Sequence, residues 1–213
     1  FPYTTLFHLN AARRAEPRDD LISALLAIED AGDTLDEDEL VSTIVLLLVT
    51  GHETTVNLIG NGVLALLRNP AHLAALRENP GLAPAVVEET IRYDPPVQLT
   101  ARVAAEPLRI GDLDVPEGSL VFLLIAAAQR DPAANPDPEI FNPYRENLRS
   151  LAFGIGPHFC LGAPLARLQG RLALTRFAQR IVDPVLVADP PPYREHLNLH
   201  GPTALPVSYP ATR

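Results

Sequence analysis

The sequence contains no methionine or tryptophan and only one cysteine, Cys160, among its 213 residues. A single cysteine excludes an internal disulfide framework, so the sequence does not imply an oxidising compartment, and we expect a cytoplasmic protein. A natural chain of this size that begins at Phe1 without an initiator methionine is also expected to have lost its beginning. We therefore expect a fragment of a longer protein.

Positive charge and long apolar runs are also scarce. The formal net charge of −9 argues against general nucleic-acid binding, because there is no basic field to release counterions from phosphates. The longest apolar run, residues 44–49, is far shorter than the roughly 20 residues that a transmembrane helix needs. We therefore expect neither a nucleic-acid nor a membrane partner.

Apolar residues recur at helical spacing through much of the chain. The pattern predicts one helix that ends at Gly32 and a second, of roughly 30 residues and about 45 Å, with a buried apolar centre. This long helix begins at a capping box, Asp36–Glu39, and ends at Arg68. Further short helices are predicted on either side of Pro80.

Residues 97–120 alternate in polarity and contain turn signals, which predicts short antiparallel strands. Residues 121–141 predict an apolar strand that leads into a proline-broken meander. Together these patterns predict a fold that is mainly α with a small β component (α+β).

The loop at residues 153–162 surrounds Cys160 with the glycines Gly154, Gly156 and Gly162. Glycine permits positive φ and the close backbone approach that a tight turn beneath a flat ligand requires. The residues after Cys160 have helical periodicity, and a helix N-terminus favours a thiolate over a thiol. This predicts a nucleophile or a metal ligand; the alternative is a lone buried cysteine that packs as a small hydrophobe.

Residues 50–55, Thr-Gly-His-Glu-Thr-Thr, interrupt the apolar centre of the long predicted helix. Polar groups in a buried helix are costly unless they meet ligands or one another. We therefore predict a second functional segment here, with a locally opened backbone and a proton path. The alternative is an ordinary capped helix with a few satisfied hydroxyls.

The Phe153-x-x-Gly156-x-His158-x-Cys160-x-Gly162 pattern resembles the haem-binding signature of the cytochrome P-450 superfamily, with every fixed position filled. The resemblance implies haem b as cofactor, with Cys160 as the axial thiolate that pushes electron density onto iron. It also implies that Phe153 packs beside the sulfur and that His158 reaches a haem propionate. Gly154, Gly156 and Gly162 would keep the loop tight around the cofactor.

By the same resemblance, the segment at residues 50–55 lies over the other haem face. Gly51 would leave room for dioxygen, Thr54 would hydrogen-bond the bound oxygen, and Glu53 would help to deliver protons to it. Thr50 stands where alanine or glycine is common in the family, so it would narrow the pocket or add a hydrogen bond.

Glu89 and Arg92 are three residues apart, close enough on one helix face to pair, and most such pairs are solvated and contribute little. The resemblance instead implies a buried structural cluster that Arg145 completes, although Asn142 replaces an aspartate that is often found there. The resemblance also implies that Arg102 binds a haem propionate, which suits the fork of a guanidinium.

The expected function is a haem-thiolate monooxygenase that inserts one oxygen atom from dioxygen into a small hydrophobic substrate. Haem would lie between a long buried helix and the cysteine loop, and residues 1–213 would form the C-terminal part of one domain whose N-terminal half is missing. Electrons would come from a ferredoxin-type donor, docking near Arg167 and Arg171. Two alternatives remain: a truncated haem-binding protein without monooxygenase activity (a haem carrier or a peroxide-using protein), and a haem-free remnant.

Overall fold

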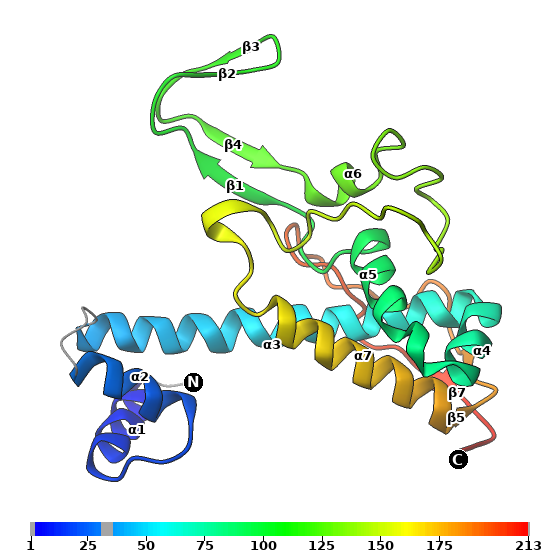
Figure 1. Cartoon of the computed structure of the whole chain (residues 1–213), viewed down its shortest axis with the longest axis horizontal. Helices are drawn as coiled ribbons and strands as arrows, with labels where there is room; N and C mark the ends of the chain where they lie inside the picture. The colour runs from blue at the N-terminus through cyan, green and yellow to red at the C-terminus, as the bar shows by residue number, and fades with distance from the viewer. Residues whose placement is uncertain (1–2, 31–35, 213) are drawn as a thin grey trace. The chain divides into compact units, whose positions relative to one another are not determined.

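A computed structural model describes residues 3–30 and 36–212, which fall into two compact units, Phe1–His52 and Glu53–Arg213 (Figure 1). Helices account for most of the regular structure and the strands are short. The prediction of a mainly α fold with a small β component is therefore confirmed. The predicted helix end at Gly32 lies outside the described residues.

The first unit contains α1 (Tyr3–Ala15), α2 (Leu21–Asp30) and the N-terminal part of α3 (Glu37–Arg68). The predicted capping box is confirmed, since the Glu39 amide donates to Asp36 Oδ1 at 2.8 Å and the Asp36 amide donates to Glu39 Oε2 at 3.0 Å. A small apolar cluster holds the unit together. Its buried members are Leu26, Leu40, Val41 and Ile44.

The long helix α3 differs from the prediction in two ways. It is α-helical throughout Glu37–Arg68, so the expected opening of the backbone is wrong. The Thr50 hydroxyl donates to the Leu46 carbonyl at 2.7 Å, so the helix itself satisfies this polar side chain. The apolar centre is also not buried: Leu46 is 59% and Val49 64% exposed. Burial on α3 is confined to Leu40, Val41 and Ile44 before this stretch and to residues from Asn57 onward after it.

Among the described residues, α3 is also the one helix that is long and apolar enough to cross a membrane by length and composition. This is weak evidence for a membrane-spanning helix, because core helices of soluble proteins meet the same criteria of length and composition.

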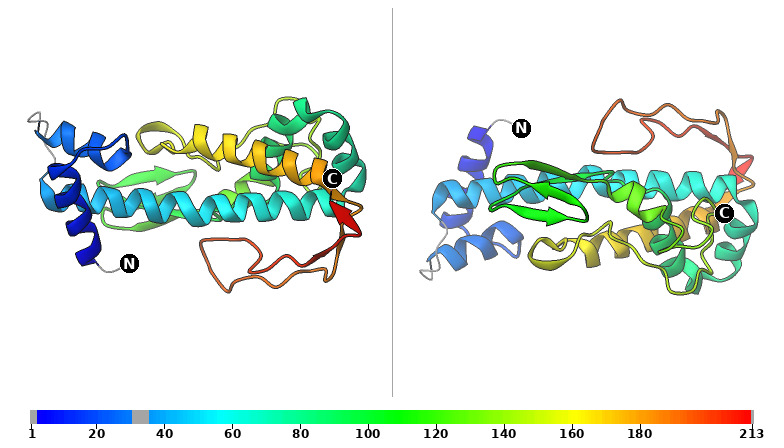
Figure 2. Two further views of the ribbon diagram at one scale, coloured as in Figure 1. Left: turned by 90° about the horizontal axis from the view of Figure 1, so that it is seen from below. Right: turned by 90° about the horizontal axis from the view of Figure 1, so that it is seen from above.

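In the second unit, the C-terminal part of α3 packs with α4 (Pro70–Glu78), α5 (Ala83–Tyr93) and α7 (Ala163–Arg180) (Figure 2). The short 3₁₀ helix η1 (Pro80–Leu82) separates α4 from α5, as Pro80 predicted. Close helix approach depends on small residues: a Cβ on Gly62 would lie 2.9 Å from Leu174, and one on Gly170 3.1 Å from Val87. The core of this unit is therefore closely packed.

Short antiparallel strands follow α5, as predicted. β1 (Thr100–Val103) pairs with β4 (Leu120–Leu123), and β2 (Leu108–Ile110) pairs with β3 (Leu113–Val115). Near the C-terminus, two-residue strands pair as β5 (Ile181–Val182) with β8 (Ala211–Thr212) and β6 (Val185–Leu186) with β7 (Val207–Ser208).

The strand expected from residue 121 ends early. After Leu123 the chain forms a short helix, α6 (Ile125–Gln129), before it enters the meander. The three alanines of α6 have high helix propensity, and the strand partner β1 is already fully used by β4. Local propensity therefore decides the structure where pairing is no longer available.

Candidate functional site

The loop before α7 is held in shape by its own backbone. The Cys160 amide donates to the Phe153 carbonyl at 2.8 Å, which closes the loop at its base. Gly154 and Gly156 have φ of +71° and +69°, a region that side chains strain to adopt. Gly156 opens a 3₁₀ turn, η2 (Gly156–His158). Conformation therefore requires glycine at 154 and 156, whereas Gly162 has an ordinary φ of −81°.

Cys160 lies directly before α7, where the Ala163 amide approaches the Cys160 carbonyl at 3.2 Å. Its thiol is unpaired and half-buried. The N-terminus of α7, which carries partial positive charge, therefore lies close to the thiol. Apolar side chains next to the sulfur remain uncovered: Ile155 is 75%, Phe159 51% and Leu161 85% exposed.

This donor set fits a haem iron. No group of three or more His, Cys, Asp or Glu residues in the described part of the chain could hold a metal ion. A lone cysteine ligand is compatible with iron in a porphyrin, which brings its other ligands with it. A Cβ on Gly162 would lie 3.9 Å from the sulfur, so the ligand atom sits close against the backbone.

The remaining predicted haem contacts are exposed. His158 lies at the end of η2. Arg102 lies on β1, where its guanidinium donates to the Ala101 carbonyl at 2.8 Å and to Thr100 Oγ1 at 3.4 Å. Since no described acid pairs with Arg102, the guanidinium carries a charge that an anionic group can neutralise.

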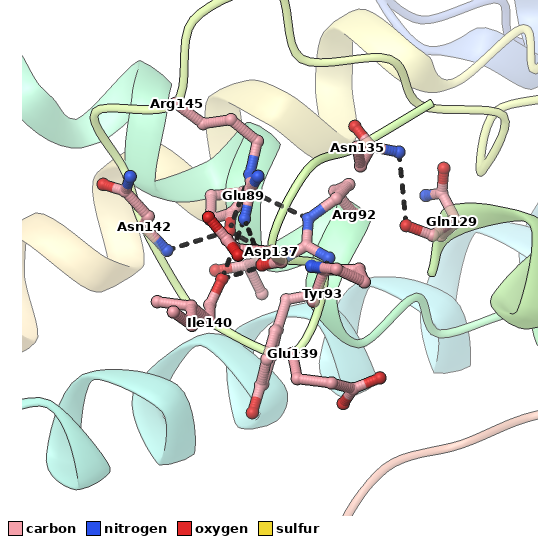
Figure 3. Close-up of polar contacts among 12 residues, drawn as sticks. Glu89, Arg92, Tyr93, Gln129, Asn135, Asp137, Glu139, Ile140, Asn142 and Arg145 are labelled. Carbon is pink, nitrogen blue, oxygen red and sulfur yellow. Dashed lines mark hydrogen bonds and ion pairs between the residues drawn. The ribbon is translucent and has the colours of Figure 1, made fainter. Parts of the chain in front are cut away.

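Glu89, Arg92 and Arg145 meet in the interior (Figure 3). Glu89 and Arg92 are fully buried and form a bidentate pair, with 2.7 Å from Arg92 Nη2 to Oε1 and 3.0 Å from Nε to Oε2. Arg145 Nε lies 3.4 Å from Glu89 Oε2, and the Asn142 amide donates to Oε1 at 2.9 Å. The buried carboxylate is thus fully paired.

The two arginines of this cluster also hold the meander in place. Arg92 donates to the Pro138 carbonyl at 2.6 Å and to the Ile140 carbonyl at 3.2 Å. Arg145 donates to the carbonyls of Asp137 and Ile140, each at 3.0 Å. One buried acid therefore fixes the segment that leads to the cysteine loop.

A buried amide near this cluster was not predicted. Gln129 donates to the Ile91 carbonyl at 3.1 Å and accepts from the Leu151 amide at 3.0 Å, just before the cysteine loop. Asn135 donates to the Gln129 carbonyl at 3.2 Å (Figure 3). No periodic pattern marks Gln129 as buried, because the three residues before it are alanines, which occur in both buried and exposed positions.

Glu53 and Thr54 lie half-buried on α3. Arg194, from the C-terminal loop, donates to Glu53 Oε1 at 2.6 Å, a partner that the sequence did not suggest. Thr50 and Gly51 belong to the first unit. A Cβ on Gly51 would meet no described atom within 4 Å, and the roles of both residues remain predictions.

The same C-terminal loop contacts the middle of α3. Asn61 Nδ2 donates to the carbonyls of Asp94 at 3.0 Å and His200 at 3.2 Å, and a Cβ on Gly201 would lie 2.4 Å from Asn57 Oδ1. Burial raises the pKa of Asp94, although the nearby charge of His200 opposes this effect. These contacts hold the loop beside Glu53 and Thr54.

Comparison with known proteins identifies relatives across almost the whole chain. The family model described as "Cytochrome P450" matches residues 6–80 and 81–191. Cytochrome P450 107B1 of Saccharopolyspora erythraea is 48% identical over 205 residues, which is 95% of this chain and 51% of that protein. The vitamin D(3) 25-hydroxylase of Pseudonocardia autotrophica is 46% identical over 200 residues, 92% of this chain and 50% of that protein.

Solved structures agree. CYP164A2 of Mycobacterium smegmatis in its ligand-free state matches with a TM-score of 0.92 and 49% identity, covering 96% of this chain and 52% of that chain. P450BioI, in complex with an acyl carrier protein ligated to hexadec-9Z-enoic acid, matches with a TM-score of 0.89 and 42% identity, over 95% and 51% of the two chains. The chain spans about half the length of the curated relatives it matches. On the family model and this identity, the chain belongs to the cytochrome P450 family.

Proposed function

We propose that this chain carries the cysteine-ligand part of a haem-thiolate monooxygenase, which inserts one oxygen atom from dioxygen into a hydrophobic small molecule. The observation that carries this proposal is the geometry at Cys160: a half-buried thiol before a helix N-terminus, in a loop closed by the hydrogen bond from the Cys160 amide to the Phe153 carbonyl. The described residues around Cys160 supply no further ligand cluster, which favours a cofactor that brings its own.

Haem b would be held by Cys160 through iron, with Phe153, Gly154 and Gly162 shaping the loop beneath it. Arg102 and His158 are the candidates for binding its propionates, because both side chains are exposed and can carry positive charge. When bound, the haem would supply the reductive activation of dioxygen. Every other task falls to the side chains of the protein.

Proton delivery is assigned to Glu53 and Thr54. The Glu53 carboxylate is one-third exposed and can exchange protons with solvent, while its ion pair with Arg194 fixes its orientation. Thr54 follows directly on α3 and would hold a proton on its hydroxyl oxygen at the pocket side.

A hydrophobic substrate agrees with the apolar side chains that remain exposed, including Phe122 and Leu123 on β4. The names of relatives point the same way: one is a vitamin D(3) 25-hydroxylase and another is the 6-deoxyerythronolide B hydroxylase of Saccharopolyspora erythraea. Hydroxylase relatives also favour a monooxygenase over a simple haem carrier.

We further assign the protein to the cytoplasm, with a ferredoxin-type electron donor, and regard the chain as one part of a single larger domain. Arg167 is a poor candidate for docking that donor. Its guanidinium already donates to both oxygens of Glu88, at 2.5 and 3.1 Å. The prediction that Arg167 meets an acidic partner is therefore not supported by its surroundings.

The proposal is tested by loading the protein with haem, reducing it and adding carbon monoxide, which should give the absorbance band typical of thiolate-ligated haem. In the loaded enzyme, Thr54→Ala should lower the product formed per electron pair consumed by about 100-fold, the lower end of the usual contribution of a group that positions a proton. Val56→Ala, two residues further along α3, is the control and should leave this ratio nearly unchanged. A thiolate-type band without any substrate oxidation would instead favour the haem-carrier alternative.

A further inference from the structure

Arg167 lies on α7 and contacts two elements at once. Its guanidinium forms a two-pronged ion pair with Glu88 on α5, with 2.5 Å from Nε to Oε1 and 3.1 Å from Nη2 to Oε2. Both side chains are only 29% exposed. Bidentate pairs of this kind fix the plane of the guanidinium, so its position is well defined.

The guanidinium also lies over an aromatic ring. Arg167 Cζ is 4.5 Å from the centroid of the Phe153 ring, which is within cation–π range. Phe153 is also the residue whose carbonyl accepts the Cys160 amide at 2.8 Å. The contacts Glu88–Arg167–Phe153–Cys160 therefore link α5 to the backbone of Cys160.

The surroundings of Arg167 also favour its charged form. The pKa of Arg167 is raised, chiefly by its hydrogen bonds to Glu88 and to a smaller extent by attraction to the Cys160 thiolate. Since the guanidinium is partly buried, solvent screens this attraction less than it would at an exposed site.

We propose that Arg167 is a positioning residue for the cysteine ligand: it fixes the ring of Phe153, whose carbonyl accepts the Cys160 amide, and, with Glu88, sets the local electric field at the iron. This inference rests on the proposed function, because it requires haem bound at Cys160. Outer contacts of this kind tune the reduction potential of a bound iron.

The test measures the reduction potential of the iron in the haem-loaded protein by spectroelectrochemistry. Arg167→Gln removes a positive charge near the site where an electron is added, so the potential should become more negative. Glu88→Gln removes a negative charge and should move the potential in the opposite direction. Arg176→Gln, which removes the same charge from an exposed position later on α7, is the matched control and should produce a much smaller shift.

Arg167→Lys keeps the charge but loses the planar fork and the stacking geometry, and its potential should lie between those of the wild type and Arg167→Gln. If Arg167→Gln does not fold, Arg167→Lys serves as the test variant in its place. Two results, each with normal haem loading, would overturn this inference alone. One is an equal shift in reduction potential for Arg167→Gln and Arg176→Gln. The other is a shift in reduction potential of the same sign for Arg167→Gln and Glu88→Gln. Failure of the wild-type protein to bind haem would overturn the proposed function as well.

Discussion

The Glu89 cluster and the Cys160 loop lie in the same unit but are built in opposite ways. Glu89 and Arg92 are fully buried, and each polar atom of the Glu89 carboxylate has partners supplied by this chain. Around Cys160, backbone hydrogen bonds fix the loop, while Ile155, Phe159 and Leu161 stay largely exposed. The chain thus supplies all the partners of the buried Glu89 cluster, which we call the scaffold, whereas apolar side chains of the predicted haem-binding loop remain exposed.

Breaking the scaffold should have the largest effect on stability. Arg92→Ala leaves the buried Glu89 carboxylate without its bidentate partner, so the free energy of unfolding should fall by about 3–5 kcal/mol. Urea denaturation followed by circular dichroism measures the change.

The matched control for Arg92→Ala is Arg109→Ala. The Arg109 side chain is 64% exposed and its acidic partners, Asp112 and Asp114, are 3.7 and 4.0 Å away. Such a pair contributes at most about 1 kcal/mol. Equal losses for the two variants would contradict the assignment of Glu89 and Arg92 as the scaffold.

Two leucines of α7 sharpen the comparison further. Leu174 is fully buried against α3, so Leu174→Ala should cost about 2–5 kcal/mol in unfolding free energy. Leu165 is 58% exposed on the same helix, and Leu165→Ala should change stability by no more than about 0.5 kcal/mol. Thermal unfolding of both variants checks this, and a large loss for Leu165→Ala would mean that this face of α7 is covered.

The smallest expected effect concerns pH. Burial raises the pKa of Asp94, so the folded state favours the neutral acid; its stabilising contribution is present below the ordinary pKa of 3.8 and is lost as pH rises through the raised value. Relative to the wild type, Asp94→Asn should therefore gain stability as pH rises from 4 to neutrality. Urea midpoints at several pH values measure this difference, and a gain that grows as pH falls would contradict the sign.

Local patterns predicted much of this structure. The capping box of Asp36 and Glu39 and the paired spacing of Glu89 and Arg92 depend on residues within one helical turn, so the sequence carries their geometry directly. The cysteine loop was likewise readable from its glycines, two of which have the positive φ that only glycine adopts easily.

Long-range partners were not predictable in the same way. Arg194 reaches Glu53 across 141 positions, and Asn61 contacts His200 across 139. Neither residue has a local pattern that marks its partner. The burial of α3 was misjudged for a related reason: apolar periodicity shows that a face can be buried, but not whether this chain supplies the residues that cover it.

The central claim is that Cys160 binds the haem iron and is not needed for the fold. The most direct measurement is a haem titration of the wild-type protein and Cys160→Ser, followed by visible absorbance, with unfolding free energies measured in parallel. We predict that the serine variant loses the thiolate-type absorbance and most of its haem affinity while its haem-free stability stays within about 0.5 kcal/mol of the wild type. Unchanged haem uptake and absorbance in Cys160→Ser would contradict the account.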